Sequence, residues 1–518
     1  MRKNKNEHRG TETQGFNFYK NLCASVSLCS FLKIAYILLT LLYIAWRIYF
    51  TLNPDQMIAS LIYLAVDIVM CFSAILFVIS LWRRHNHSMP EESSKLLSID
   101  VFVPTYNEDC EMLEITLQHC IEMDYPHKTY LLDDGNRLEM KLLAEKLGVE
   151  YIAREKNINA KAGNLNNAMR ETKGELIAVF DADFRPEKEF LSRLTGYFNN
   201  EKIAVVQTPQ FYYNTDSFQH RRLSPDKIYS EQDTFMHLVL PARNNWNAAY
   251  WIGTNALMRR EAIESIGGFP TDCVTEDVLT SMFLHGKGWK TMYVDEPLAY
   301  GFAPANISQY FIQRLRWAKG AYQILRSHNP LFKKGLSTMQ RLLYLSSVSH
   351  FFEGSLRIAY YLFPAFFFLF GVFPVYPYPP IIIEMLIYFG VSRLILKVIT
   401  QRRTNMIMDD IYSVVKSFIS LMALPAFISG KNVRFSVTPK DSGKSVSWHG
   451  FTGPVVIFGF NFAAMLMVMF NPSLDLLGWI VFGWCLYISG IALIACYYCF
   501  KYLFQREVRK EREDAKKN

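Results

Sequence analysis

Residues 99–108 read Ile-Asp-Val-Phe-Val-Pro-Thr-Tyr-Asn-Glu, in which a short apolar run, Ile99–Val103, ends in polar residues. Three further short apolar runs follow, at residues 129–132, 149–152 and 176–180, and a segment with helical periodicity separates each run from the next. Short strands that alternate with helices predict a parallel sheet with helices on both faces. The expected helices cover residues 110–122, 137–147, 160–172 and 187–198.

Polar and acidic residues follow three of the four expected strands. One Asp after a strand is commonly a helix cap or a turn former. Several unpaired carboxylates would repel one another, however, and a cation is their natural partner. Ligands of such sheets bind beyond the carboxyl ends of the strands, and hard oxygen ligands around a phosphate-bearing substrate suit Mg²⁺ or Mn²⁺. The strand-end residues are Thr105, Glu108, Asp133, Asp134, Asp181 and Asp183.

A basic segment, Lys161-Ala162-Gly163-Asn164-Leu165-Asn166, opens the third expected helix. It combines a cation with the backbone N–H groups of a helix N-terminus, which is a suitable place for a diphosphate. This part of the sequence contains neither a G-x-x-x-x-G-K-[ST] loop nor a G-x-G-x-x-G fingerprint, which disfavours a P-loop ATPase and a dinucleotide enzyme.

A carboxylate motif and an amphipathic helix are expected after this sheet. Thr275-Glu276-Asp277 follows a glycine-rich turn, and residues 306–326 predict a helix with two distinct faces. Gln313, Arg316, Trp317 and Gly320 share one face, which can neutralise phosphate and stack on a sugar ring. The alternative is a membrane-surface helix with a mixed polar face. We expect the opposite stripe to rest on the membrane: Ile307, Phe311, Leu315, Ala318, Tyr322 and Leu325.

Apolar residues, 51% of the 518, cluster before residue 85 and after residue 330. Runs of about 20 apolar residues are long enough to cross a bilayer, so the pattern indicates a membrane protein with a large inserted domain. The third expected span is interrupted by His350, Glu353 and Arg357. The expected spans are Phe31–Phe50, Met57–Trp82, Leu343–Phe373, Pro380–Ile399, Val455–Phe470 and Leu476–Phe500.

Basic residues lie on one side of these spans, including Arg83, Arg84 and the tail from Lys501. The positive-inside rule therefore predicts that both termini and the central domain are cytoplasmic. The net charge of +8 suits anionic lipid headgroups rather than nucleic acid. Asp409–Met422 predicts a second amphipathic helix, which we expect to lie along the inner membrane surface.

Six motifs together resemble those of the processive family-2 glycosyltransferases, and most closely those of the catalytic subunit of bacterial cellulose synthase. Phe435–Lys440 is also similar to the F-x-V-T gating loop of that subunit. The resemblance implies a GT-A-like (Rossmann-like) α/β cytoplasmic domain inserted in an α-helical transmembrane domain with amphipathic interface helices. The motifs, in order, are Pro104–Glu108, Asp133–Gly135, Lys161–Asn166, Asp181–Asp183, Thr275–Asp277 and Gln313–Trp317.

The resemblance also implies a role for each donor-side residue. Asp134, with Asp133 as its neighbour, would contact the uridine of a UDP-sugar, in a pocket shaped by Thr105 and Glu108. Asp183, supported by Asp181, would hold the Mg²⁺ (or Mn²⁺) that bridges the two phosphates. Lys161 and Arg316 would bind the same diphosphate, where preorganised cations stabilise the leaving group.

On the acceptor side, the resemblance assigns the general base to Asp277, within Thr275-Glu276-Asp277, because a positioned carboxylate can take the proton of an attacking hydroxyl. Gln313 and Trp317 would hold the terminal sugar of the growing polysaccharide. Trp317 could instead be an interfacial aromatic anchor, but it lies opposite the apolar stripe. Phe435, Val437, Thr438 and Lys440 would form a gating loop over the bound nucleotide; the alternative for these residues is an ordinary cytoplasmic connection.

The expected domain order differs from that of the cellulose synthase subunit, which usually has four spans before its catalytic domain and a C-terminal module that binds cyclic di-GMP. This sequence has two expected spans there and about 18 residues after the last one, so we expect an accessory or regulatory subunit to supply any such control. The expected domains are a tail with two spans (1–97), the glycosyltransferase domain with an interface helix (98–330), a transmembrane hairpin (331–400), an interface helix and gating loop (401–451), and a hairpin with a basic tail (452–518).

The resemblance implies a processive, inverting β-glycosyltransferase of the cell membrane that polymerises UDP-glucose into a cellulose-like β-glucan and extrudes it. The same outline also suits mixed-linkage or β-1,3-glucan, hyaluronan or poly-N-acetylhexosamine. A non-processive transferase that acts on a lipid carrier needs neither the 313–317 motif nor the 435–440 loop. A non-catalytic pore or scaffold subunit has no use for the carboxylates of Asp134, Asp183 and Asp277.

Overall fold

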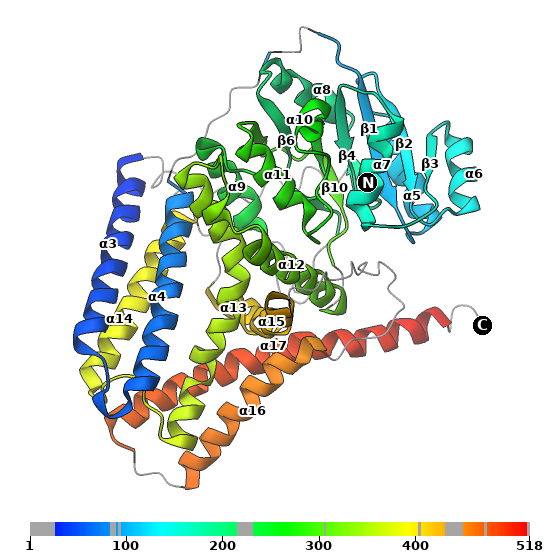
Figure 1. Cartoon of the computed structure of the whole chain (residues 1–518). Coiled ribbons are helices and arrows are strands. Elements are labelled where there is room, and N and C mark those ends of the chain that lie inside the picture. Colours follow the sequence, from blue (N-terminus) through cyan, green and yellow to red (C-terminus); the bar gives the residue numbers. More distant parts are fainter. Residues whose placement is uncertain are drawn as a thin grey trace.

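The chain folds into an α/β domain that lies against a group of long helices (Figure 1). α3 (Val26–Phe50) and α4 (Met57–Ser80) precede this domain in the sequence, and the other long helices follow it. The computed structural model describes residues 26–82, 90–91, 95–214, 231–304, 307–401, 403, 406–429, 449–470 and 474–514.

Seven strands form the main sheet, in the order β3-β2-β1-β4-β8-β6-β9. The first four strands are parallel, as predicted, and their bounds agree with the predicted runs to within two residues. β8 pairs antiparallel with both β4 and β6, so the sheet is mixed, which the alternation of strands and helices did not predict. The strands are β1 (Ile99–Thr105), β2 (Lys128–Asp133), β3 (Glu150–Ala153), β4 (Leu176–Val179), β6 (Ile203–Gln207), β8 (Ala256–Arg259) and β9 (Lys290–Tyr293).

Helices cover both faces of this sheet because successive strand residues point to opposite sides. Val101 and Val103 of β1 pack on one face with α5, α6 and α8, whereas Phe102 packs on the other with α7 and α10. A small second sheet has the strand order β5-β10-β7, and its first strand follows β4 in the sequence. These elements are α5 (Cys110–Ile121), α6 (Leu138–Leu147), α7 (Ala160–Glu171), α8 (Phe190–Thr195), α10 (Arg260–Ser265), β5 (Arg185–Pro186), β7 (Phe211–Tyr212) and β10 (Ala299–Gly301).

All six predicted spans lie in helices, but only four of them are among the five described helices that are long and apolar enough to cross a membrane. α13 and α14 are the two that do not qualify, yet α14 packs beside α3, and α13 packs against α4. In α13, Glu353 is buried, and Arg357 donates to Ser413 at 3.1 Å. Both charged groups therefore contact protein. The later helices are α13 (Thr338–Phe370), α14 (Pro379–Ile399), α15 (Met406–Ser429), α16 (His449–Phe470) and α17 (Leu476–Asp514).

The fifth apolar helix, Ile407–Ile428, belongs to α15, which the sequence placed on the membrane surface. Figure 1 shows α15 nearly end-on, whereas α4 and α14 run across the view, so α15 crosses their direction. Its apolar residues Ile411, Val414 and Val415 are buried against α12 (Ile307–Ser327), α16 and α17.

The apolar stripe of α12 does not rest on the membrane, and that expectation was wrong. Ile307 and Phe311 are buried against α15, α16 and α17, and Ala318 and Tyr322 are buried beside Ala423 of α15. α12 thus lies between the α/β domain and the long helices (Figure 1), with both of its faces in contact with protein.

Candidate active site

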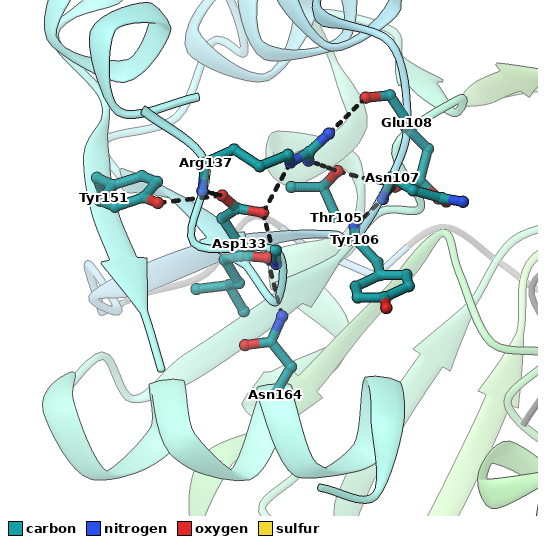
Figure 2. Close-up of polar contacts among 10 residues, drawn as sticks. Thr105, Tyr106, Asn107, Glu108, Asp133, Arg137, Tyr151 and Asn164 are labelled. Atoms are coloured by element: carbon teal, nitrogen blue, oxygen red, sulfur yellow. Dashed lines mark hydrogen bonds and ion pairs between the residues drawn. The ribbon is translucent and has the colours of Figure 1, made fainter. Parts of the chain in front are cut away.

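The carboxyl end of β2 is organised around Asp133, which is fully buried (Figure 2). Its oxygens accept hydrogen bonds from the backbone N–H of Gly135 (2.9 Å) and of Arg137 (2.6 Å), and from the hydroxyl of Tyr151 (3.0 Å). The Arg137 side chain adds an ion pair at 3.2 Å. A carboxylate with this many donors is well compensated for burial. Asp133 therefore holds the loop after β2 in place.

Arg137 also joins this loop to the end of β1 (Figure 2). Its guanidinium donates to the Thr105 hydroxyl and to the Glu108 carbonyl, both at 2.8 Å. Thr105 in turn donates to the Glu108 carboxylate at 2.8 Å, which also accepts the backbone N–H of Tyr106. Thr105, Glu108 and Asp133 are thus brought together, as predicted. Arg137 was not among the predicted site residues, although it is a cation only four residues after Asp133 in the sequence.

Asp134, beside Asp133, is paired with a second cation. The Arg154 side chain, just beyond β3, makes a two-point ion pair with this carboxylate, with one contact of 2.7 Å between Nη2 and Oδ2. Burial raises the pKa of Asp134, and Arg154 partly opposes that shift. Arg154 also donates to the carbonyls of Ile158 and Ala160, directly before Lys161. One guanidinium therefore connects the end of β2 to the start of α7.

Lys161 lies in the first turn of α7, after two residues with left-handed backbone. Asn159 has φ 64° and Ala160 has φ 44°, which is strained for residues other than glycine. The Lys161 ammonium forms an ion pair with Asp181 and donates to the carbonyl of Gly253 at 2.6 Å. The basic helix start and the acidic end of β4 are therefore in direct contact.

Asp181 and Asp183 are the residues that would hold a divalent cation. Asp183 is buried, with 6% of its surface exposed, and the backbone N–H of Asp181 donates to the Thr254 hydroxyl at 2.9 Å. Among the described residues, no group of three acidic, His or Cys side chains could hold a metal ion by itself. Two carboxylates fit the usual Mg²⁺ site in phosphate-transferring enzymes, where substrate phosphates and water complete the coordination.

Asp277 lies in the first turn of α11 (Glu276–Gly286), across Gly253 from Lys161. Gly253 has φ +93°, and a Cβ there would meet Asp277 Oδ2 at 3.4 Å. The backbone N–H of Val278 donates to Asp277 Oδ1 at 2.8 Å. The structure therefore places Lys161, Asp181 and Asp277 around one glycine, although they are far apart in the sequence.

The charge of Asp277 is controlled by its surroundings. Burial raises the pKa of Asp277 to about 7, and the adjacent carboxyl of Glu276 acts in the same direction. The positive charges of Lys161 and Arg316 oppose that shift. Burial likewise raises the pKa of Glu276, with Lys161 and Arg316 again opposing it. The Arg316 side chain of α12 thus acts on the same carboxyls as Lys161.

Close packing of α12 fixes the loop that carries Asp277. A Cβ at Gly320 would meet the Thr275 side chain at 2.4 Å, so only glycine allows this approach. Gln323, one turn further along, accepts the backbone N–H of Val274 at 3.0 Å. The predicted face of α12 therefore does point toward Thr275–Asp277. Gln323 was not among the predicted residues, although it lies three residues after Gly320 and so continues the helical spacing of that face.

Gln313 and Trp317 both contact Arg314, a residue that the sequence analysis did not select. The Arg314 guanidinium carbon lies 4.2 Å from the centre of the Trp317 ring, and Nη1 donates to Gln313 Oε1 at 2.9 Å. Arg314 is buried and pairs with Glu231 at 2.9 Å. The predicted gating residues Phe435, Val437, Thr438 and Lys440 lie outside the described residues.

Two family models match the part of the chain that contains these residues. Residues 100–267 match the family described as Glycosyl transferase family 2, and residues 200–445 match the one described as Cellulose synthase. The chain is 38% identical to the cellulose synthase catalytic subunit [UDP-forming] of Pseudomonas fluorescens (strain SBW25) over 56% of its own length and 40% of that protein. It is 36% identical to the cellulose synthase 1 catalytic subunit [UDP-forming] of Komagataeibacter xylinus over 66% of its length and 47% of that protein.

The predicted resemblance to family-2 glycosyltransferases, and to the cellulose synthase catalytic subunit, is therefore confirmed. The chain spans 22% to 47% of the length of the curated relatives it matches. Among solved structures, the mannosyltransferase PcManGT from Pyrobaculum calidifontis, in complex with GDP-Man and Mn²⁺, covers 72% of this chain and 99% of its own, with 16% sequence identity and a TM-score of 0.52. That likeness concerns the fold and confirms the predicted GT-A-like domain.

Proposed function

We propose that this protein is a processive, inverting β-glycosyltransferase that polymerises a UDP-sugar, with UDP-glucose as the first donor to test and a cellulose-like β-glucan as product. The observation that carries the proposal is the arrangement of Lys161, Asp181 and Asp277 around Gly253. A cation, a metal-type carboxylate and a carboxyl with a raised pKa are the groups that leaving-group departure and acceptor attack require.

The donor would bind along the carboxyl ends of the parallel strands. Asp134, set in position by Arg154, would meet the nucleoside at the end of β2. The diphosphate would then extend toward Lys161 and Asp183, with Arg316 approaching from α12. A bound divalent cation would supply charge neutralisation to the two phosphates. Lys161 would contribute the fixed protein charge on the same side of the reaction.

The acceptor would enter from the α12 side. Asp277 would take the proton from the attacking hydroxyl, and its pKa of about 7 suits a general base at neutral pH. Trp317 would stack on the terminal sugar of the acceptor, and Gln313 would hydrogen-bond to it. The hydroxyl would attack the anomeric carbon on the face opposite to the departing diphosphate, and the configuration would then invert and give a β-linked product.

The long helices would provide the route across the membrane, with the α/β domain and both termini in the cytoplasm. α12 lies at the junction between the candidate active site and these helices, and α13 carries Glu353 and Arg357 where they contact protein. Polar residues inside a membrane domain commonly mark a substrate path. The product would be handed from the acceptor site directly into the helical part, and control of the process would come from an accessory subunit.

The identity of the donor sugar is the part of the proposal for which other candidates fit the same residues. The donor-side groups named above serve the nucleotide and the diphosphate, which other UDP-sugars share. The same machinery would serve mixed-linkage or β-1,3-glucan, hyaluronan or poly-N-acetylhexosamine synthesis. The alternative that involves no enzyme activity is a non-catalytic pore or scaffold subunit.

The test is a donor panel. Membranes that contain the chain, with Mg²⁺ and partner subunits present, are given UDP-glucose, UDP-N-acetylglucosamine or UDP-glucuronate, and UDP release and polymer are measured. Digestion of the polymer with linkage-specific glycosidases then identifies the product. We expect UDP release and a β-1,4-glucan from UDP-glucose. Polymer from a different donor, or with a different linkage, would show that the proposed product is wrong. If no donor gives UDP release, the enzyme proposal is wrong and the pore-subunit alternative remains.

A further inference from the structure

A buried charge cluster joins α12 to α15 on the side of α12 that carries the acceptor residues. Its centre is Glu231, whose side chain is 13% exposed. One carboxylate oxygen accepts from Arg314 of α12 at 2.9 Å and from the Tyr310 hydroxyl at 2.6 Å. The other oxygen pairs with Lys416 of α15 at 2.6 Å. One carboxylate thus binds two cations from two different helices.

The electrostatics show that Glu231 is held as an anion. Burial alone would raise its pKa, but the charges of Arg314 and Lys416 and the hydrogen bonds of the cluster more than reverse this, so the pKa lies below its usual range. Removal of one partner from such a cluster leaves a buried charge uncompensated. Glu231 therefore fixes the position of both cations for as long as the protein is folded.

Arg314, held by Glu231, in turn contacts the predicted acceptor residues Gln313 and Trp317. Its guanidinium lies 4.2 Å from the centre of the Trp317 ring and 4.7 Å from that of Tyr310, so it is held between two aromatic rings. It also donates to Gln313 at 2.9 Å. A planar guanidinium can make a forked ion pair and stack at the same time, which an ammonium group cannot do.

We propose that Arg314, anchored by Glu231 and Lys416, is a positioning residue that sets the Trp317 ring and the Gln313 amide for the terminal sugar of the acceptor. This inference rests on the proposed function and deepens it. Arg314 touches neither donor nor acceptor; it acts through the two side chains that do. Its loss leaves donor binding intact and lowers transfer of sugar to the chain end, so that more of the donor is hydrolysed.

The decisive variant is Arg314→Lys, which keeps the charge beside Glu231 but removes the stacked plane and the fork. The readout is the ratio of sugar incorporated into polymer to free sugar released by hydrolysis of the donor, with UDP affinity measured by calorimetry on the same preparation. We expect the ratio to fall about tenfold while UDP affinity changes less than twofold, a size in keeping with the loss of one buried cation–π contact. A general loss of structure would lower both quantities together.

Two further variants keep the inference falsifiable if Arg314→Lys is poorly folded. Lys416→Met leaves the Glu231–Arg314 pair in place but removes the ion pair between Glu231 and α15, and we expect a smaller fall in the ratio, about threefold. Arg193→Lys is the matched control, because Arg193 pairs with Glu296 at 2.7 Å on the exposed surface of the α/β domain. It should leave the ratio unchanged.

Two results would overturn the inference in distinguishable ways. If the wild-type chain releases no UDP from any donor, the proposed function falls, and this inference falls with it. If the wild-type chain makes polymer and both Arg314→Lys and Lys416→Met keep the wild-type ratio, the positioning role alone is wrong.

Discussion

Gly253→Ala is the substitution that most sharply tests the geometry of the candidate site. Gly253 has φ +93°, its carbonyl accepts from Lys161, and its missing Cβ faces Asp277 Oδ2 at 3.4 Å. An alanine forced into left-handed backbone costs about 1–2 kcal/mol. The peptide can relieve this strain only by rotating, and rotation moves the carbonyl away from the Lys161 ammonium.

The size of the effect follows from these contacts. A hydrogen bond to a charged group contributes about 1.5–3 kcal/mol. We expect the transition state to lose half to all of that energy, and a small displacement of Asp277 to raise the barrier further. The two effects together raise the barrier by about 3 kcal/mol, which corresponds to about a hundredfold loss of turnover. The assay is UDP release at saturating donor.

Gly148→Ala is the matched control for this experiment. Gly148 ends α6 with φ +69°, and nothing lies within 4 Å of a Cβ at that position. The backbone strain in this variant should be similar and should lower the midpoint of thermal unfolding by a similar amount. Its turnover should stay at the wild-type value. Wild-type turnover in Gly253→Ala, with the same loss of thermal stability as Gly148→Ala, would refute the reasoning, because it would show that the Gly253 peptide does not position the reacting groups.

Three other predictions concern the same site. Burial raises the pKa of Asp277 from its ordinary value of 3.8 to about 7, so between these pH values the native state binds more protons than the unfolded state. The free energy of unfolding should therefore fall as the pH rises through this range, while turnover should rise because the base loses its proton. A pH–rate profile that is flat from 5 to 8 would contradict the base role. EDTA should abolish UDP release and Mg²⁺ or Mn²⁺ should restore it, whereas full activity in EDTA would remove the metal role of Asp181 and Asp183. Arg154→Met should weaken UDP binding about tenfold, because Asp134 loses its two-point partner; unchanged affinity would show that Asp134 does not need it.

The strands and their acidic ends could be predicted from the sequence because both signals are local. The apolar runs and the intervening helical periods gave the bounds of β1 to β4 to within two residues. Parallel strands bring their carboxyl ends to one edge, so Asp133 and Asp181 had to lie on the same side of the domain. The contact between Lys161 and Asp181 follows from this topology.

The remaining features depend on contacts between distant segments. β8 enters the sheet antiparallel between β4 and β6, and no local pattern specifies that neighbour. Arg154 and Arg314 could not be selected, because their partners, Asp134 and Glu231, are 20 and 83 residues away. The stripe on α12 was identified correctly as apolar, but hydrophobicity alone does not distinguish lipid from another helix, and the stripe packs against α15.

The most direct test of the account is a paired measurement on Asp277→Asn. The substitution keeps the size of the side chain and removes the group that would accept the proton. The account predicts that the variant binds UDP with wild-type affinity and releases UDP from the preferred donor at least a thousandfold more slowly, in the range that loss of a general base gives. Turnover within tenfold of wild type, with UDP binding intact, would contradict the claim that this carboxylate performs the chemistry.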